Sequence, residues 1–148
     1  MATIKSYTDL EQSKKLAEIL QLESADMFWY RDAVTKENNP RIMSLSKVPK
    51  NKSMYYSPCW SLAALLDLLP SEFTTVGKYA TTTYKIKIRK YKFVNDVDLY
   101  QIGYGNYKFY EDGNSSWKDM INTGQKEELI DAAFEMICWL KENNPYKE

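Results

Sequence analysis

The chain contains no histidine among its 148 residues and only two cysteines. Histidine is the commonest side chain for proton transfer near neutral pH. Its absence excludes a Ser-His-Asp triad, a Cys-His pair and a zinc site that contains histidine. Two cysteines are also too few for a cysteine-only metal site. The sequence therefore predicts no metal and no other cofactor, and it favours a protein that is not an enzyme. Chemistry by carboxylates, lysine, tyrosine or magnesium stays open.

Long apolar runs are also missing. Residues 1–6 lack the apolar core of a signal peptide. The run from Leu62 to Leu66 is far shorter than the ~20 apolar residues of a membrane-spanning helix. Cys59 and Cys138 lie in patterns typical of amphipathic helices, so we expect both to be buried, reduced thiols. Together these features predict a cytoplasmic protein without membrane association.

The chain is long enough to fold around its own core. Its length is near that of a typical domain, and 44% of its residues are hydrophobic. We find no internal repeat, no low-complexity tract and no composition typical of a linker. We therefore expect one domain that spans residues 1–148.

The first half of the chain predicts a helix, a hairpin and a second helix. The pattern Thr8-x-x-Glu11 is a capping box before apolar residues at helical spacing, which predicts a helix over residues 9–21. Residues 26–48 are typical of a hairpin whose second strand runs from Ile42 to Val48. Ser57 and Pro58 resemble a cap followed by proline at the first helical position, and Pro70 would end that helix.

The second half predicts three strands and a last helix. Tyr84, Ile86 and Ile88 alternate with basic residues, as in a half-buried strand. Residues 95–98 and the pair Gly105-Asn106 are typical of turns. These signals predict strands at residues 84–92, 100–104 and 107–109, and a helix at residues 125–143. The expected fold is α+β, in the order α-β-β-α-β-β-β-α, with three helices packed on an antiparallel sheet of about five strands.

Charge is unevenly distributed although the net charge is zero. Residues 41–92 contain ten basic and two acidic residues, whereas residues 93–148 contain five basic and eleven acidic ones. Residues 78–92 contain six basic residues and no acid. This asymmetry is the strongest indication of a binding surface in the sequence.

A basic strand face is the candidate site. Lys85, Lys87 and Arg89 alternate along the strand and should project from one face. Its remaining candidate residues are Lys90 and Lys92, with Tyr91 and Tyr110 as surfaces on which bases could stack.

Three interpretations of this face stay open. In the first, its lysines discourage pairing between sheet edges, and the acidic C-terminal third of the chain neutralises them. In the second, they bind an acidic partner. In the third, they bind nucleic acid. The isoelectric point near 6.4 is below that of most nucleic-acid-binding domains.

Other polar and aromatic groups have structural alternatives. Asp96 with Asp98, and Glu111 with Asp112, would serve magnesium binding or acid–base chemistry, but both pairs fit the chemistry of turns better. The chain has twelve tyrosines and four tryptophans. Most should pack in the core. An exposed recognition patch is the alternative for Tyr30, Tyr55, Tyr56 and Trp117.

Three segments carry a resemblance. Residues 22–27, 60–70 and 129–141 are LESADM, WSLAALLDLLP and LIDAAFEMICWLK. Their arrangement resembles small hypothetical proteins encoded by gut Bacteroides and by their phages and mobile elements. The resemblance covers most of the chain and implies no enzymatic activity or site residues. It favours a small accessory or regulatory protein that acts by binding.

We therefore expect a non-enzymatic protein-binding or regulatory domain, whose partner is another protein or a second copy of the chain. The alternative is a nucleic-acid-binding protein that uses the basic strand at residues 84–92.

Overall fold

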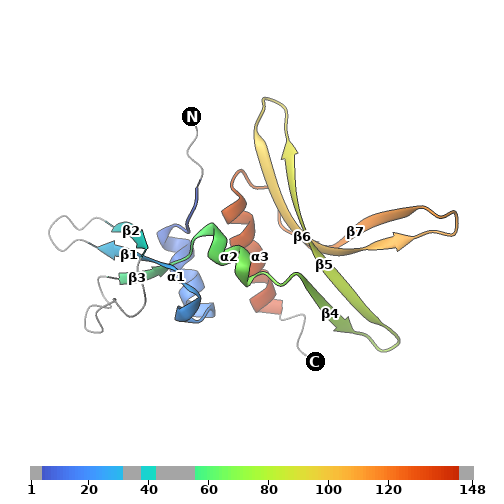
Figure 1. The fold of residues 1–148 in the computed structure, drawn as a ribbon, viewed down its shortest axis with the longest axis horizontal. Helices are drawn as coiled ribbons and strands as arrows, with labels where there is room; N and C mark the ends of the chain where they lie inside the picture. Colours follow the sequence, from blue (N-terminus) through green and yellow to red (C-terminus); the bar gives the residue numbers. More distant parts are fainter. Residues whose placement is uncertain (1–4, 32–37, 43–55, 144–148) are drawn as a thin grey trace. The chain divides into compact units, whose positions relative to one another are not determined.

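The computed structural model describes residues 5–31, 38–42 and 56–143 (Figure 1). Residues 32–37 and 43–48 of the predicted hairpin, and Tyr55, lie outside the described residues. The chain divides into two compact units, residues 1–68 and residues 69–148, each with its own sheet. The expectation of one domain over the whole chain stays a prediction.

The first unit contains a three-stranded antiparallel sheet in the order β2-β1-β3. Strand β1 pairs on both sides, so that Met27 faces Ile42 on one neighbour and Cys59 on the other. Its elements are α1 (Leu10–Ile19), a 3-10 turn (Leu22–Ser24), β1 (Met27–Arg31), β2 (Asn38–Ile42), β3 (Tyr56–Cys59) and α2 (Leu62–Leu68).

Helix α1 forms where it was expected, but its capping box begins one residue later. Asp9 is the N-cap and accepts a hydrogen bond from the Gln12 backbone, while the Gln12 side chain accepts one from the Asp9 backbone. Thr8 is instead fully buried, and its Oγ1 accepts the backbone N–H of Trp60. The carboxylate caps better here because it faces solvent, where a charge is not desolvated.

The prediction that a helix begins at Ser57-Pro58 is wrong. Both residues lie in β3, and Pro58 fits there because β3 is an edge strand, where a missing N–H costs little. Cys59 therefore lies on a strand and not on a helix, although it is buried as expected. Helix α2 begins later because Ser61 caps it: its Oγ accepts from the Ala64 N–H.

The second unit contains a four-stranded antiparallel sheet in the order β4-β5-β6-β7, followed by α3. Strands β5 and β6 are the longest, and each extends into a hairpin (Figure 1). The bounds are β4 (Glu72–Val76), β5 (Thr81–Lys92), β6 (Asp98–Phe109), β7 (Ser115–Asn122) and α3 (Leu129–Asn143).

The predicted tight turn at Gly105-Asn106 does not exist. Strand β6 continues through both residues, and it pairs with β7 before, at and after them along the chain. The register shifts at this point, because Tyr104 faces Ile121 whereas Gly105 faces Asp119. Met120 is therefore the extra residue of a β-bulge in β7. The glycine that signals a turn in the sequence serves the bulge instead.

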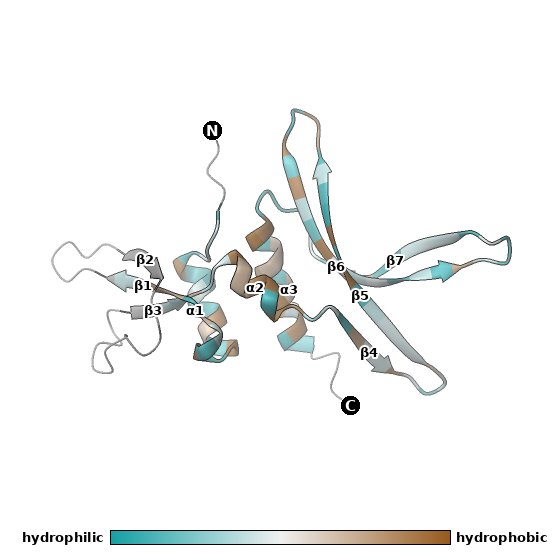
Figure 2. Cartoon of the chain, viewed as in Figure 1, coloured by the Kyte–Doolittle hydropathy of each residue, from teal (hydrophilic) through white to brown (hydrophobic). Residues whose placement is uncertain are grey.

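The core of the second unit lies where α3 contacts β6. Ile102 and Tyr104 are fully buried, and Phe73 packs against the Tyr104 ring with 5.0 Å between centroids. The Tyr104 hydroxyl donates to the Pro70 carbonyl at 2.6 Å, so this buried polar atom is satisfied. The hydrophobic residues of α3 form its buried side (Figure 2): Ile130, Ala132, Ala133, Met136, Ile137, Cys138 and Leu140.

The α+β class, the three helices, the antiparallel strands and the broad order along the chain are confirmed. The prediction of one sheet with about five strands is wrong in its count. Two sheets form, and they include β3, β4 and β7, which the sequence did not predict.

Candidate functional site

Strand β5 places its alternate side chains on opposite faces of the second sheet. Lys85, Lys87, Arg89 and Tyr91 share one face, which we call the basic face. Strand β5 pairs with β4 over Thr81–Lys85 and with β6 over Lys85–Lys92, so residues 87–92 have β6 as their only neighbour among the described strands. The hypothesis that its lysines protect a sheet edge therefore stays a prediction for residues 87–92.

Two glycines on β6 bring side chains of β5 and β7 together on the basic face. Gly105 faces Lys85 on one side and Asp119 on the other, and Gly103 lies between Lys87 and β7. A Cβ at Gly105 would lie only 2.2 Å from the Lys118 carbonyl oxygen. Because these positions carry no side chains, residues two strands apart make direct contact.

The first such contact is the ion pair between Arg89 and Asp119. Two guanidinium nitrogens donate to the two carboxylate oxygens at 2.7 and 3.1 Å. The Trp117 indole and the Asn122 amide also donate to this carboxylate. Burial alone would raise the pKa of Asp119, but these hydrogen bonds and the positive charge of Arg89 outweigh it and hold the pKa below its usual value. Hydrogen bonding to Asp119 raises the pKa of Arg89.

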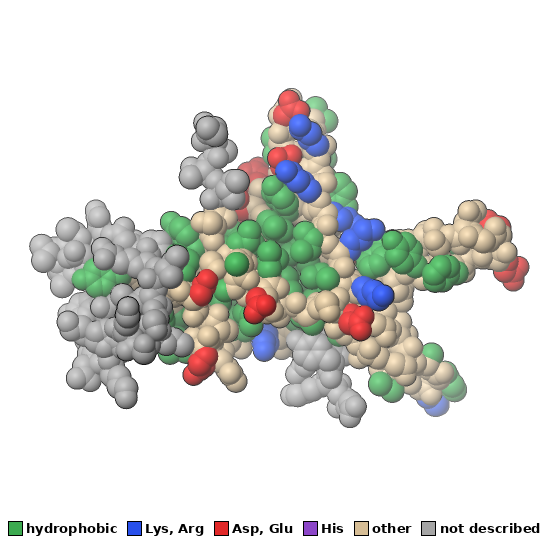
Figure 3. Space-filling model, viewed as in Figure 1, with side chains coloured by type: hydrophobic (Ala, Val, Ile, Leu, Met, Phe, Trp, Pro, Cys, Tyr) green, Lys and Arg blue, Asp and Glu red, His purple; other side chains and the backbone are tan. Residues whose placement is uncertain are grey.

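The second contact joins Lys87 to an aromatic cluster. The Lys87 Nζ lies 4.8 Å from the centre of the Trp117 ring, and Tyr107 meets the same ring edge-on at 5.2 Å. Phe109 follows Tyr107 on the same face of β6 and is 81% exposed. We call Tyr107, Phe109 and Trp117 the aromatic stripe. Figure 3 shows hydrophobic and basic side chains next to one another where β7 leaves the sheet.

The structure brings together only part of the predicted site. Lys85, Lys87, Arg89 and Tyr91 share the basic face, and Tyr91 donates to Gln101 there. Lys90 and Lys92 project from the opposite face, where Asp98 and Asp96 neutralise them. Tyr110 follows the end of β6, and its hydroxyl contacts Ser116 on the face away from Lys85.

The hypothesis that the acidic third neutralises the basic strand is confirmed in part. Arg89, Lys90 and Lys92 each pair with an aspartate from residues 96–119. Helix α3 contributes to none of these pairs, and it contacts β6 where Ile102 and Tyr104 are buried. Lys85 and Lys87 form no ion pair within the described parts of the chain.

Three of the four carboxylates in the predicted pairs have partners close to them along the chain. Asp96 and Asp98 are held in ion pairs, and the Asp112 carboxylate accepts two hydrogen bonds from Asn114 within its turn. No group of three metal-ligating side chains occurs among residues 5–31, 38–42 and 56–143.

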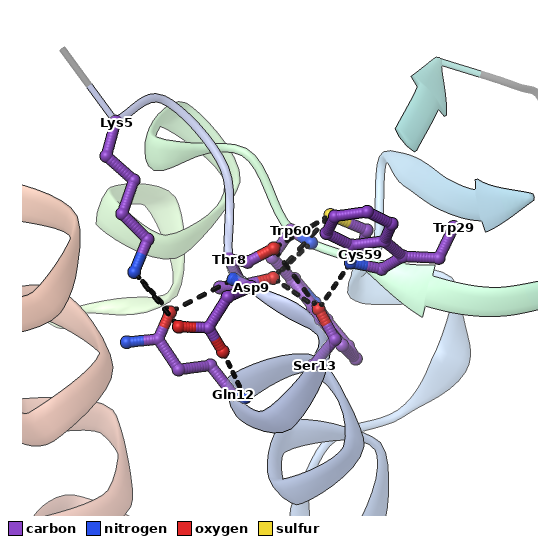
Figure 4. A network of polar contacts seen from close by, with 8 residues as sticks. All are labelled: Lys5, Thr8, Asp9, Gln12, Ser13, Trp29, Cys59 and Trp60. Atoms are coloured by element: carbon purple, nitrogen blue, oxygen red, sulfur yellow. Dashed lines mark hydrogen bonds and ion pairs between the residues drawn. The ribbon is translucent and has the colours of Figure 1, made fainter. Parts of the chain in front are cut away.

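A buried polar network lies in the first unit (Figure 4). The Thr8 and Ser13 hydroxyls are 2.7 Å apart, the Trp29 indole donates to Ser13, and the Cys59 thiol donates to the Thr8 carbonyl. Burial raises the pKa of the Cys59 thiol, which favours the neutral form over the nucleophilic thiolate. All these groups satisfy one another, so the network stabilises the join between α1 and β3.

The sequence interpretation did not include Tyr107, Phe109 and Asp119 in the site, and it considered Trp117 only as part of a different patch. Two signals were present: period-two spacing at Tyr107-x-Phe109 and at Trp117-x-Asp119. What was missing was the pairing of β6 with β7, which places both motifs beside Lys87.

No helix of the described residues is both long and apolar enough to cross a membrane. No protein-family model matches the chain, and no curated protein or solved structure shows significant similarity to it. The resemblance to hypothetical proteins of Bacteroides stays a prediction.

Proposed function

We propose that this chain is a non-enzymatic binding protein, and that the aromatic stripe together with Lys85 and Lys87 binds a protein partner. The partner surface that fits is an apolar segment flanked by acidic side chains. One observation carries the proposal: Phe109 and Tyr107 are 81% and 54% exposed on the same face as two lysines that form no ion pair within the described residues.

The exposed aromatic side chains favour binding over a purely structural role. Trp117 already contacts the Lys87 ammonium group with its ring, and Tyr107 supports Trp117. Phe109 is not needed for either contact. Burying such a side chain stabilises a complex by roughly 1.5–3 kcal/mol, and aromatic residues are enriched among those that dominate binding energy.

The charges near the stripe favour an acidic protein over nucleic acid. Lys85 and Lys87 can each pair with a carboxylate of the partner, whereas Arg89 is occupied by Asp119. Glu111 and Asp112 follow the stripe at the tip of the β6–β7 hairpin. They would repel a continuous phosphate backbone that extended along the hairpin, whereas the acidic side chains of a protein partner can be confined to the end of the stripe near Lys85 and Lys87.

The location in the cytoplasm is part of the proposal. Cys59 and Cys138 are both buried and neither forms a disulfide bond. A reducing compartment agrees with this state of the thiols.

Selection of peptides from a random library by the intact protein tests the proposal. We expect the selected peptides to combine acidic residues with Leu, Phe or Trp. Phe109→Ser should weaken their binding, measured by fluorescence polarisation, by at least about tenfold. Tyr79→Ser is the matched control, because Tyr79 is an exposed aromatic at a different hairpin and its loss should change affinity by less than about twofold.

Equal binding of the selected peptides to the wild type and to Phe109→Ser would refute the proposed site. A labelled single-stranded oligonucleotide provides the second measurement. Binding that weakens steeply with salt and is lost in Phe109→Ser would replace the protein partner with nucleic acid.

A further inference from the structure

The outer edge of β4 lies at the opposite side of the sheet from β7. The Ile86 N–H donates to the Ser71 carbonyl, and the Gly77 N–H donates to the Ala80 carbonyl. In an antiparallel pair, backbone groups of alternate residues point toward the partner strand. Ser71 and Gly77 therefore point toward β5, as do Phe73 and Thr75 between them. The backbone groups of Glu72, Thr74 and Val76 point outward, and no described strand pairs with them.

The first and last strands of this sheet differ in the protection of their outer edges. Strand β7 carries the bulge at Met120 and the exposed Lys118, which are features that discourage pairing at an edge. Strand β4 has the sequence Glu-Phe-Thr-Thr-Val, without proline, lysine or an irregularity in its register. Its outward residues Thr74 and Val76 are exposed. Threonine and valine favour strands, so this edge is prepared to accept another strand.

We propose that the outer edge of β4 pairs antiparallel with β4 of a second copy of this chain. The two-fold axis passes beside Thr74, so that Thr74 faces Thr74 of the second copy. Glu72 then faces Val76 of the second copy, and Val76 faces its Glu72. In this register every outward-pointing residue of one strand meets an outward-pointing residue of the other, so all their N–H and C=O groups can pair.

Charge favours this register over its neighbours. Glu72 is the only charged residue of β4. A shift that placed Glu72 opposite Glu72 would juxtapose like charges and lose backbone pairs. The register centred on Thr74 places each Glu72 against an aliphatic side chain, and its own neighbour on β5 is Lys85. A second copy is therefore an occupant whose outward residues all pair with this edge and place no like charges opposite one another.

Only five residues of each copy form the shared edge, so the dimer should be weak. Sedimentation velocity of the full chain tests it. We expect a reversible monomer–dimer equilibrium with a dissociation constant on the order of 10–500 µM. Thr74→Lys and Thr74→Glu each place a like charge at the axis, and each should weaken the dimer by at least about tenfold. An equimolar mixture of the two variants should restore it.

Thr83→Lys is the matched control. Thr83 lies beside Thr74 on the same face, and the two hydroxyls are 3.1 Å apart. Both substitutions therefore lose the same side-chain hydrogen bond and add the same charge, but only the backbone groups of residue 74 lie on the outer edge of β4, because those of Thr83 point to the other side of β5. Circular dichroism verifies that each variant is folded.

Three outcomes would overturn the proposal. The wild type stays monomeric up to about 500 µM, or Thr83→Lys weakens the dimer as much as Thr74→Lys does, or the mixture of Thr74→Lys and Thr74→Glu fails to associate. None of these outcomes bears on the aromatic stripe, which lies on the β6–β7 hairpin.

Discussion

Gly105→Ala tests how closely the backbones of β6 and β7 approach each other. The added Cβ would lie 2.2 Å from the Lys118 carbonyl oxygen and 2.9 Å from the Asp119 Cα. Both atoms belong to the backbone of the neighbouring strand and cannot rotate away. An ordinary contact needs at least 3.4 Å, so β7 must move by about 1 Å.

The expected loss follows from two opposing effects. Adding a methyl group to a closely packed position costs about 1–3 kcal/mol. Replacing glycine in a strand returns roughly 0.5–1 kcal/mol, because the unfolded chain loses freedom. The movement of β7 also strains the pairing of Arg89 with Asp119. We therefore expect the free energy of unfolding to fall by about 2 kcal/mol.

Urea unfolding followed by circular dichroism measures this difference. Gly124→Ala is the control, because its nearest neighbours are the flexible side-chain atoms of Lys126 at 3.8 and 3.9 Å. Gly124→Ala should change the free energy of unfolding by less than about 0.5 kcal/mol. If Gly105→Ala were as stable as the wild type, the close approach of β7 to β6 would be refuted.

Three further predictions concern single side chains. Asp119→Asn should lower the free energy of unfolding by about 1–2 kcal/mol at neutral pH. Because folding lowers the pKa of Asp119, its stabilisation is complete above the pKa of the unfolded chain and is lost as pH falls through the folded value. The difference between variant and wild type in urea titrations should therefore narrow below about pH 4, and a constant difference would contradict the ion pair. Asp9→Ala should cost about 1 kcal/mol through loss of the cap, whereas the exposed Lys14→Ala should cost less than about 0.5 kcal/mol; equal losses in thermal melts would argue against the cap. Iodoacetamide should label Cys59 only after denaturation, and rapid labelling of the native protein would show that the thiol is accessible.

Local signals predicted the long helices well. Helix α3 was expected over residues 125–143 and forms at Leu129–Asn143, because its apolar period spans four turns and Asn144-Pro145 follows it. Helix α1 shifted by a residue at its start because Thr8 and Asp9 are both good caps. Only the tertiary contact of Thr8 with Trp60 decided between them.

The strands that were missed have ambiguous local patterns. Ser57-Pro58 is a good helix start in sequence, and pairing with β1 overrides it. The alternation of β7 is interrupted by Met120, since a bulge shifts the period-two pattern by one residue. A single extra residue therefore concealed both the strand and the aromatic stripe beside it.

Only the part of the candidate site that lies on β5 was predicted from the sequence. The alternation of β5 was enough to place Lys85, Lys87 and Arg89 on one face. Their partners Trp117 and Asp119 are separated from them by about 30 positions along the chain. No local pattern identifies such contacts, because they depend on the order of the strands and on the two glycines of β6.

The bulge at Met120 also sets a limit on assembly. When two copies join through β4, the combined sheet ends in a β7 strand on both sides. Each terminal strand carries the irregular step and the exposed Lys118, so a third copy finds no regular ladder to extend. Further pairing through β7 is therefore disfavoured. The same residue that disturbs the sequence pattern would thereby oppose growth of the paired sheet through β7.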